Sequence, residues 1–423
     1  MRNNSTQPLS RRRFLKLGGG LVGLGAAATL LPRAILKPES VEAGLRAQIT
    51  EPNLHFAATD GWIHLPGANA PYHPDDMAPD GLTTYIFGFR NVTGLTRDQA
   101  FAQKMKAQLT APTWWLDQGQ DFTLKLTNLG LQIRPDLIDA HTLHFHGFRN
   151  AIPIFDGEPH SSVGVPIARD LTYFYRPHHP GTYLYHCHFE ETEHVHMGMI
   201  GVVFVRPELN QTAGGKFAYN DVATEYDREF VLNMNEVWSL AHWCDSHVQL
   251  PEWSDYQPDL WLINGRAYPD TIAPAGGGTD PVTGDLIPPP GRSDLQYQPI
   301  SSLIRCNSGD RVLLRFVNLG FTEHAMRLSG IPMRVVGKDA TPLQGRGGND
   351  LTYMTDTVHI SPGESLDAIF VAPDVSSETR LLLHDRRYKY TGNPGMSGYG
   401  GQITEVHILP TSQPLPEQTE PNT

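Results

Sequence analysis

Histidines are concentrated in one segment of this chain. Ten of the 19 lie between residues 141 and 196, and five of these ten stand in two short motifs. The motifs are His141-Thr-Leu-His144-Phe-His146-Gly147 and His186-Cys187-His188. Imidazole and thiolate are ligands of transition metals. Neither isolated core histidines nor a zinc site requires a cysteine with a histidine on each side, so the pattern predicts a redox metal site.

Alternation along a β-strand sorts the side chains of each motif onto two faces. His144 and His146 share one face, and His141, three residues earlier, lies on the other. In the second motif the two histidines share a face, from which Cys187 points away. We therefore expect two pairs of imidazoles to converge on one side, while one thiolate and one imidazole meet on the other.

These two groups suit two different copper centres. A thiolate, two imidazoles and a weak axial thioether form a blue, or type 1, copper site, for which the predicted ligands are His141, Cys187, His194 and Met199. Imidazole pairs without a thiolate suit a second copper centre of type 2 or type 3 character, for which the predicted ligands are His144, His146, His186 and His188. Because Cys187 is bonded through the chain to a histidine on each side, the backbone offers an electron path between the two centres.

The motifs resemble those of multicopper oxidases, which have the form HxxHxHG and HCH, followed by a histidine and then Gly-Met. The match covers most of the first half of the chain, including Phe155-Asp156-Gly157 and residues 181–186. It implies cupredoxin-like domains, copper as the cofactor, and an oxidase that passes single electrons from a donor to dioxygen. In the family, three residues separate HCH from the next ligand histidine, whereas in this chain five residues separate them. We choose His194 because it precedes Met199 by five residues, as in the family, and the alternative pair is His196 and Met197.

The second half of the chain departs from the laccase pattern. A laccase-type trinuclear cluster needs four further histidines, from two HxH motifs in another domain. In an internal alignment, Arg327 and Ser329 stand in place of the first HxH pair, and Asp385 and Arg386 replace the cysteine and last histidine of HCH. Two histidines survive at corresponding positions, and His384 is the predicted additional ligand.

Three functions remain open from the sequence. The resemblance favours an oxidase whose donor is a small molecule such as a phenol, a metal ion or a protein. Copper nitrite reductases also resemble this plan, and His146, His186 and His384 fit their catalytic site, in which a neighbouring subunit supplies the last histidine; that arrangement implies a closed ring such as a homotrimer. The third hypothesis is a copper-binding or electron-carrying protein without catalysis. Asp156, in the turn after the HxHG strand, is the candidate proton donor for reduction of dioxygen or nitrite.

The elements that must position these side chains have the pattern of β-strands. Short runs rich in Val, Thr, Tyr, Phe and Leu are separated by Pro and Gly clusters, and no long stretch repeats with a helical period. Segment 119–130 returns as 309–320, each with Asn-Leu-Gly at its end, which indicates a duplicated domain. We predict an all-β fold of two tandem cupredoxin-like Greek-key β-sandwich domains, residues 44–210 and 221–410, with a disordered tail over 411–423.

The N-terminus has the features of an export signal. Ser10-Arg-Arg-Arg-Phe-Leu-Lys16 precedes an apolar, glycine-rich run over residues 17–31 and a cleavage point near Val41-Glu42-Ala43. We interpret residues 1–43 as a twin-arginine signal, which predicts a periplasmic or extracellular protein without a membrane span in its mature form. Their removal takes away seven basic and two acidic residues and changes the formal charge from -12 to -17. This acidic balance argues against nucleic acid as a partner.

The three cysteines are too few for a disulfide scaffold. Cys187 is assigned to the metal. Cys244 and Cys306 either pair in an oxidising compartment or remain two buried thiols, and the sequence leaves both arrangements open.

Overall fold

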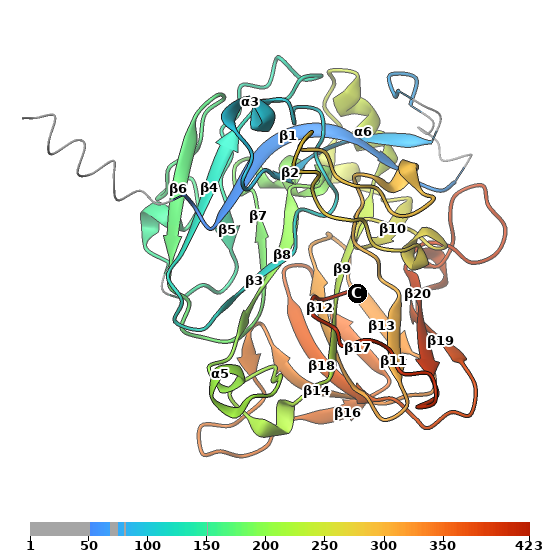
Figure 1. Cartoon of the computed structure of the whole chain (residues 1–423). Coiled ribbons are helices and arrows are strands. Elements are labelled where there is room, and N and C mark those ends of the chain that lie inside the picture. The colour runs from blue at the N-terminus through green and yellow to red at the C-terminus, as the bar shows by residue number, and fades with distance from the viewer. Residues whose placement is uncertain (1–50, 68–74, 80–81, 150) are drawn as a thin grey trace, which may run out of the picture. The chain divides into compact units, whose positions relative to one another are not determined.

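The regular structure of this chain is mostly β-strand, arranged in four sheets (Figure 1). The computed structural model describes residues 51–67, 75–79, 82–149 and 151–423. The predicted export signal, residues 1–43, lies outside the described residues. Residues Pro52–Thr423 form one compact unit. The all-β fold predicted from the sequence is confirmed.

Two sheets are built from the first half of the chain. The first has the order β2-β1-β4-β6, with β1 (Leu54–His64), β2 (Thr83–Asn91), β4 (Phe122–Asn128) and β6 (Asp170–Tyr175). The second has the order β3-β8-β7-β5, with β3 (Trp114–Asp117), β5 (His144–Phe145), β7 (Gly181–His186) and β8 (Ile200–Arg206). The two histidine motifs therefore lie on neighbouring strands of the same sheet, since β5 pairs with β7.

The other two sheets come from the second half of the chain. One has the order β10-β9-β12-β18-β14-β15, with β16 paired to β14, and consists of β9 (Arg228–Val237), β10 (Leu260–Ile263), β12 (Arg311–Asn318), β14 (Met333–Lys338), β15 (Thr341–Pro342), β16 (Tyr353–Thr355) and β18 (Ser365–Val371). The last sheet has the order β11-β20-β19-β13-β17, with β11 (Ile304–Asn307), β13 (His324–Leu328), β17 (Thr357–Ile360), β19 (Thr379–Asp385) and β20 (Ile403–Leu409).

The same strand order occurs in both halves of the chain. The order β2-β1-β4-β6 corresponds to β10-β9-β12-β18, and β3-β8-β7-β5 corresponds to β11-β20-β19-β13. The repeated Asn-Leu-Gly motif makes the same local bond twice: Asn128 Oδ1 accepts from the Gly130 N–H at 2.8 Å, and Asn318 Oδ1 accepts from the Gly320 N–H at 2.9 Å. The internal sequence repeat thus reflects a repeated architecture. The domain bounds 44–210 and 221–410 stay a prediction.

Alternating strands bury an aromatic core in the first half. In β4, Phe122, Leu124 and Leu126 are buried while the residues between them are partly exposed, as expected for a sheet with one face on a core. Cys187 and Met199 belong to this same hydrophobic cluster. The predicted type 1 ligands are therefore held inside a packed interior.

Short helices connect the strands. They are α3 (Arg97–Phe101), α4 (Glu191–Met197), α5 (Leu209–Ala213) and α6 (Ser239–Ser246), and the 3-10 turns are η1 (Pro153–Phe155), η2 (Val222–Thr224), η3 (Trp253–Asp255), η4 (Asp270–Ile272), η5 (Ser293–Leu295) and η6 (Tyr388–Tyr390). Among the described residues, no helix has both the length and the apolar composition needed to cross a membrane. Helix α4 begins within the five residues between HCH and His194 and carries His194 itself.

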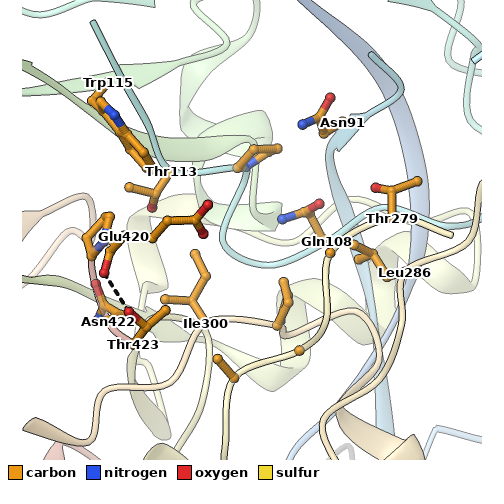
Figure 2. A pocket seen from close by; sticks show the side chains of 16 residues that line it. Asn91, Gln108, Thr113, Trp115, Thr279, Leu286, Ile300, Glu420, Asn422 and Thr423 are labelled. Carbon is orange, nitrogen blue, oxygen red and sulfur yellow. Dashed lines mark hydrogen bonds between the residues drawn. The ribbon is translucent and has the colours of Figure 1, made fainter. Parts of the chain in front are cut away.

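The C-terminal segment 411–423 corrects one prediction, because it is ordered against β9. The Glu229 N–H donates to Gln418 Oε1 at 2.7 Å, and the Val231 N–H donates to Asn422 Oδ1 at 2.9 Å. Strand β10 pairs only with the later part of β9, so side-chain amides of the tail satisfy the earlier backbone groups. Figure 2 shows Glu420, Asn422 and Thr423 along one side of a surface pocket.

Candidate metal centre

Three predicted type 1 ligands meet inside the first half of the chain. Cys187 Sγ lies 3.7 Å from His141 Nδ1 and 3.4 Å from His194 Nδ1. All three side chains are buried, and their ligand atoms form a group able to hold a metal ion. Cys187 directly follows β7, whereas His194 lies on α4. Residues from separate elements thus converge on one thiol.

Met199 is tied to this group through the backbone. Its N–H donates to the His194 carbonyl at 2.9 Å, and its carbonyl accepts from the Cys187 N–H at 3.1 Å. The side chain is fully buried in the same cluster as Cys187. A thioether in that position has the chemistry of an axial copper ligand, and this role for Met199 stays a prediction.

Helix α4 separates the two candidate histidines. His194 faces Cys187, while His196, two residues on, has its Nε2 in use as the acceptor of the Trp238 N–H at 3.1 Å. Residues two apart on a helix point to nearly opposite sides. The geometry therefore favours His194 over the alternative pair of His196 and Met197.

Two further residues contact the type 1 group, and no sequence motif indicates either of them. The Thr142 N–H donates to Cys187 Sγ at 3.5 Å. Asp139 Oδ2 lies 3.7 Å from His194 Nε2, on the side away from the sulfur. Burial lowers the pKa of His194, but the charge of Cys187 and a hydrogen bond to Asp139 outweigh it and raise that pKa to about 10. For His141, burial and the charge of His194 hold the pKa well below its ordinary value.

Three histidines of the predicted second centre also converge. Ligand atoms of His144, His146 and His186 lie within 4.8 Å of one another, and the Nε2 atoms of His146 and His186 are 2.8 Å apart. His188 is next to this group, with its ring 4.9 Å from that of His144. Its buried Nδ1 has no hydrogen-bond partner among the described residues. A buried nitrogen without a partner is expected where a metal ion binds.

Backbone carbonyls orient two of these imidazoles. His144 Nδ1 donates to the Asp156 carbonyl at 2.6 Å, and His186 Nδ1 donates to the Cys187 carbonyl at 2.7 Å. Because a carbonyl only accepts, the proton lies on Nδ1 and Nε2 carries none, as a metal ligand requires. Burial lowers the pKa of His146 to about 4 and that of His186 well below its ordinary value, so these rings are neutral near pH 7.

The turn at Asp156 and Gly157 lies against the strand of the first motif. Gly157 has φ +79°, and a Cβ there would lie 2.1 Å from the Leu143 carbonyl oxygen, so only glycine fits. The Asp156 carboxylate is 3.8 Å from His144 Nδ1. Its predicted role as proton donor stays a prediction, while its carbonyl orients His144.

The second half of the chain has the same strand pairing as the second metal centre but lacks most of its ligand residues. His144 pairs with His186 across β5 and β7, and Arg327 pairs with His384 at the corresponding position of β13 and β19. His384 Nδ1 donates to the Asp385 carbonyl at 2.8 Å, as His186 does to Cys187. No group of potential metal-ligand atoms within the described residues includes His384. The chain therefore does not bring this predicted ligand to its own second centre.

The counterpart of the type 1 site in the second half is an ion cluster. His324 Nδ1 lies 3.1 Å from Asp385 Oδ2, and His324 Nε2 lies 3.8 Å from Glu236 Oε2. Burial opposes the charged imidazole, but hydrogen bonds to the two carboxylates raise the pKa of His324. A carboxylate thus stands where the first half has its thiol.

Cys187, Cys244 and Cys306 are all free and buried. Of the two arrangements left open by the sequence, the structure therefore has Cys244 and Cys306 as separate thiols. Both behave as small buried hydrophobic side chains.

Comparison with known proteins identifies the family. Two multicopper oxidase family models match residues 91–210 and 242–380, and together they span more than half of the chain. The chain therefore belongs to the multicopper oxidase family. It is 28% identical to Laccase-15 of Oryza sativa subsp. japonica over 298 residues, and 24% identical to Laccase-25 of the same plant over 296 residues. Each match covers 68% of this chain but 41% and 43% of the two laccases, so the chain spans less than half of their length.

Solved structures share the fold over most of the chain. The blue copper oxidase from Nitrosomonas europaea matches with a TM-score of 0.56 and 22% identity, covering 84% of this chain and 85% of that protein. The copper nitrite reductase from Nitrosomonas europaea matches with a TM-score of 0.53 and 16% identity, covering 87% and 96%. These likenesses concern the fold.

The residues present fit copper, the cofactor that family membership implies. One group offers a thiol and two imidazoles, and the other offers imidazoles alone. The unpartnered His188 Nδ1 is a buried nitrogen of the kind that metal sites contain. Thiolate with imidazole is the donor set of blue copper, and imidazole without thiolate suits a copper that binds oxygen ligands.

Proposed function

We propose that this protein is a copper-dependent oxidase that takes single electrons at the type 1 group and delivers them to dioxygen at the second group. One observation carries the proposal. The thiol of Cys187 belongs to the first group of ligand atoms, and the imidazole of the preceding residue, His186, belongs to the second. Two centres joined by one peptide bond have a short covalent path for electrons.

This chain's own residues supply the rest of the site. Burial of the type 1 ligands excludes water from them, and the carbonyls of Asp156 and Cys187 hold two imidazoles of the second group in the tautomer that binds metal. Copper, when bound, supplies the one-electron chemistry. Asp156, with a side chain 36% exposed beside His144, is the proposed source of protons for the reduced oxygen.

The test is copper loading followed by oxygen uptake. The copper-free protein is loaded with copper, and its copper content, electron paramagnetic resonance spectrum and oxygen consumption are measured with a phenol, with ferrous iron and with a reduced electron-transfer protein as donors. We expect a blue and a non-blue centre in each chain, and donor-dependent oxygen uptake that Cys187→Ser abolishes. A single copper per chain without consumption of oxygen or nitrite would instead support a copper-binding or electron-carrying protein.

Nitrite reduction is the second candidate. The observation that favours it is the loss of histidines from the second half, where Arg327 occupies the position of His144 and Asp385 that of Cys187. Three converging imidazoles suffice for one catalytic copper. Nitrite-dependent turnover without oxygen uptake in the loaded protein would establish this candidate over the first.

We further propose that a neighbouring subunit supplies His384 to the second centre, in a closed ring such as a homotrimer. A head-to-tail contact of this kind must close on itself. Light scattering would give the mass of the assembly. Mixing inactive His186→Ala and His384→Ala subunits should restore part of the activity, because some interfaces then combine the intact His186 of one chain with the intact His384 of the next.

Export by the twin-arginine route, to the periplasm or the cell exterior, is also proposed from residues 1–43. The Arg11-Arg12 pair within Ser10–Lys16 carries this proposal. Replacing both arginines by lysine should leave the chain in the cytoplasm, which cell fractionation with immunoblotting would detect. Equal export of the variant would contradict the assignment.

A further inference from the structure

A cavity of about 260 Å³ lies between the two halves of the chain. Its lining includes Arg149, His178 and His179 from the first half, Asp221 from the segment that joins the halves, and Ala340 and Thr341 from the second half. None of the lining residues belongs to the two groups of copper ligands. The volume is below the usual range for drug-sized molecules, so the cavity suits a small ligand.

Arg149 gives this cavity a permanent positive charge. Its Nη2 donates to Thr341 Oγ1 at 3.1 Å, which is a bond to a neutral hydroxyl. Among the described residues, no ion pair includes Arg149. Most N–H donors of the guanidinium are therefore available, and their planar arrangement matches the oxygen atoms of a carboxylate or phosphate. The arginine is held in place without being neutralised.

Two neighbouring imidazoles add donors to the same cavity. His178 and His179 are exposed, and neither ring has a hydrogen bond or an ion pair within the part of the chain that the structure describes. Their backbone is fixed, because the His178 carbonyl accepts from Gln118 Nε2 at 2.9 Å and the His179 carbonyl accepts from the Tyr183 hydroxyl at 2.7 Å. A neutral imidazole donates one N–H and a protonated imidazole donates two. Both rings can therefore donate to an anion beside Arg149.

A strained turn forms the opposite wall. Asp339 and Ala340 connect β14 to β15 with φ +49° and +50°, a conformation that alanine rarely adopts. Segment 178–181 packs closely against this turn, since a Cβ on Gly181 would lie 2.6 Å from Ala340 Cα. The turn orients Thr341, whose Oγ1 donates to the Asp339 carbonyl at 3.2 Å and accepts from Arg149. Strain of this kind is typical of functional sites.

Asp221 is the one carboxylate among the residues that line the cavity. Its Oδ1 accepts the Ala223 N–H at 2.9 Å and so caps η2. The negative charge of Asp221 opposes an anion and would attract a cation. The effect of removing this charge therefore shows which sign of ligand the cavity binds.

We propose that this cavity, here called the Arg149 cavity, binds a small tetrahedral oxyanion, phosphate or sulfate, between the guanidinium of Arg149 and the imidazoles of His178 and His179. The ligand class follows from an arginine without a carboxylate partner, from two free imidazoles and from a volume too small for a large molecule. The site is independent of the proposed oxidase function. Because both halves line the cavity, the bound anion links them and stabilises the folded chain.

Calorimetric titration of the copper-loaded protein with inorganic phosphate, at constant ionic strength, tests the site. We expect saturable binding of one phosphate per chain, with which sulfate competes and tetramethylammonium does not. Arg149→Gln should weaken binding about tenfold or more, because charged hydrogen bonds are lost. Arg305→Gln is the matched control, since Arg305 is another exposed arginine that no ion pair of the described residues includes. Absence of saturable binding, or equal weakening in both variants, would overturn the proposal.

Asp221→Asn tests the sign of the ligand charge. This variant keeps an oxygen that can accept the Ala223 N–H, and it should bind phosphate several-fold more tightly because a repelling charge is removed. Weaker phosphate binding in Asp221→Asn would contradict an anion site.

Two further measurements separate the Arg149 cavity from binding of phosphate to copper. The electron paramagnetic resonance spectrum should not change at saturating phosphate, and phosphate should raise the urea midpoint of the wild-type protein but not that of Arg149→Gln. A spectral change that is equal in Arg149→Gln, or an equal rise of both midpoints, would place the anion elsewhere and overturn the proposal.

Discussion

His194 Nδ1 lies 3.4 Å from Cys187 Sγ, although the two residues belong to a helix and to the end of a strand. Of the five residues that separate His188 from His194, the last three begin α4, and the last helical turn returns the histidine to the sulfur. The metal group therefore depends on a local helix that carries His194. Substitutions on both sides of this contact test it.

Replacement of the sulfur is the first prediction. Cys187→Ser should lose the intense blue absorption completely, because charge transfer from thiolate to copper is its source. Copper content should fall by about one ion per chain, since a thiolate is replaced by a weak neutral ligand. Absorption spectra and metal analysis of the loaded protein give both values.

Cys306→Ser is the matched control, because Cys306 is also free and buried. It lies in β11, in the core of the second half. This variant should stay blue. A Cys187→Ser protein that remained blue would mean that another residue holds the type 1 copper.

The second prediction compares the two histidines of α4, His194 and His196. His194→Gln should abolish the blue band, whereas His196→Gln should keep it and lower the free energy of unfolding by about 1–2 kcal/mol, because the imidazole that accepts the buried Trp238 N–H and packs against the Trp253 ring is lost. Spectra and urea unfolding curves distinguish the two variants. The reverse result, with colour lost only in His196→Gln, would move the type 1 site to the other face of the helix.

Many of the residues of this site could be predicted from the sequence, because their positions depend on local strand geometry. Strand alternation places Cys187 and His186 on opposite faces, and the internal repeat locates the degenerate copy around Asp385. The partner of His194, Asp139, lies 55 residues earlier in a connecting segment, so its position depends on tertiary packing that no motif encodes. Residues 411–423 were predicted to be disordered because they have few apolar side chains. Their amides instead satisfy backbone groups of β9, a contact set by the register of a distant strand.

The order of this tail leads to a stability prediction. Asn422 is 8% exposed; its Oδ1 accepts the Val231 N–H, and its Nδ2 donates to the carbonyls of Val231 and Ser301. Asn422→Ala leaves these groups without partners, so the free energy of unfolding should fall by about 2 kcal/mol. Chemical denaturation measures the change. The exposed Glu420 provides the control, since Glu420→Ala should change stability by less than about 0.5 kcal/mol; equal effects of the two variants would mean that the tail contributes little.

Gly157 tests how the second centre is positioned. A Cβ at residue 157 would lie 2.1 Å from the Leu143 carbonyl oxygen and 2.7 Å from the His144 nitrogen. Gly157→Ala must therefore push the Asp156 turn away from His144 and lengthen the 2.6 Å bond that orients its imidazole. We expect copper to leave the second centre and oxygen uptake to fall about 100-fold, the cost of displacing a catalytic group by about 1 Å, while the blue band stays.

Gly330→Ala separates this steric effect from backbone strain. Gly330 has a similar φ of +83°, but its added Cβ would meet no atom within 4 Å. Both variants place alanine at positive φ, which lowers the free energy of unfolding by about 1 kcal/mol in each. Unfolding measurements give this common effect. Only Gly157→Ala should lose non-blue copper and oxygen uptake. If Gly330→Ala lost them equally, or if Gly157→Ala kept both, the turn at Asp156 would not position His144.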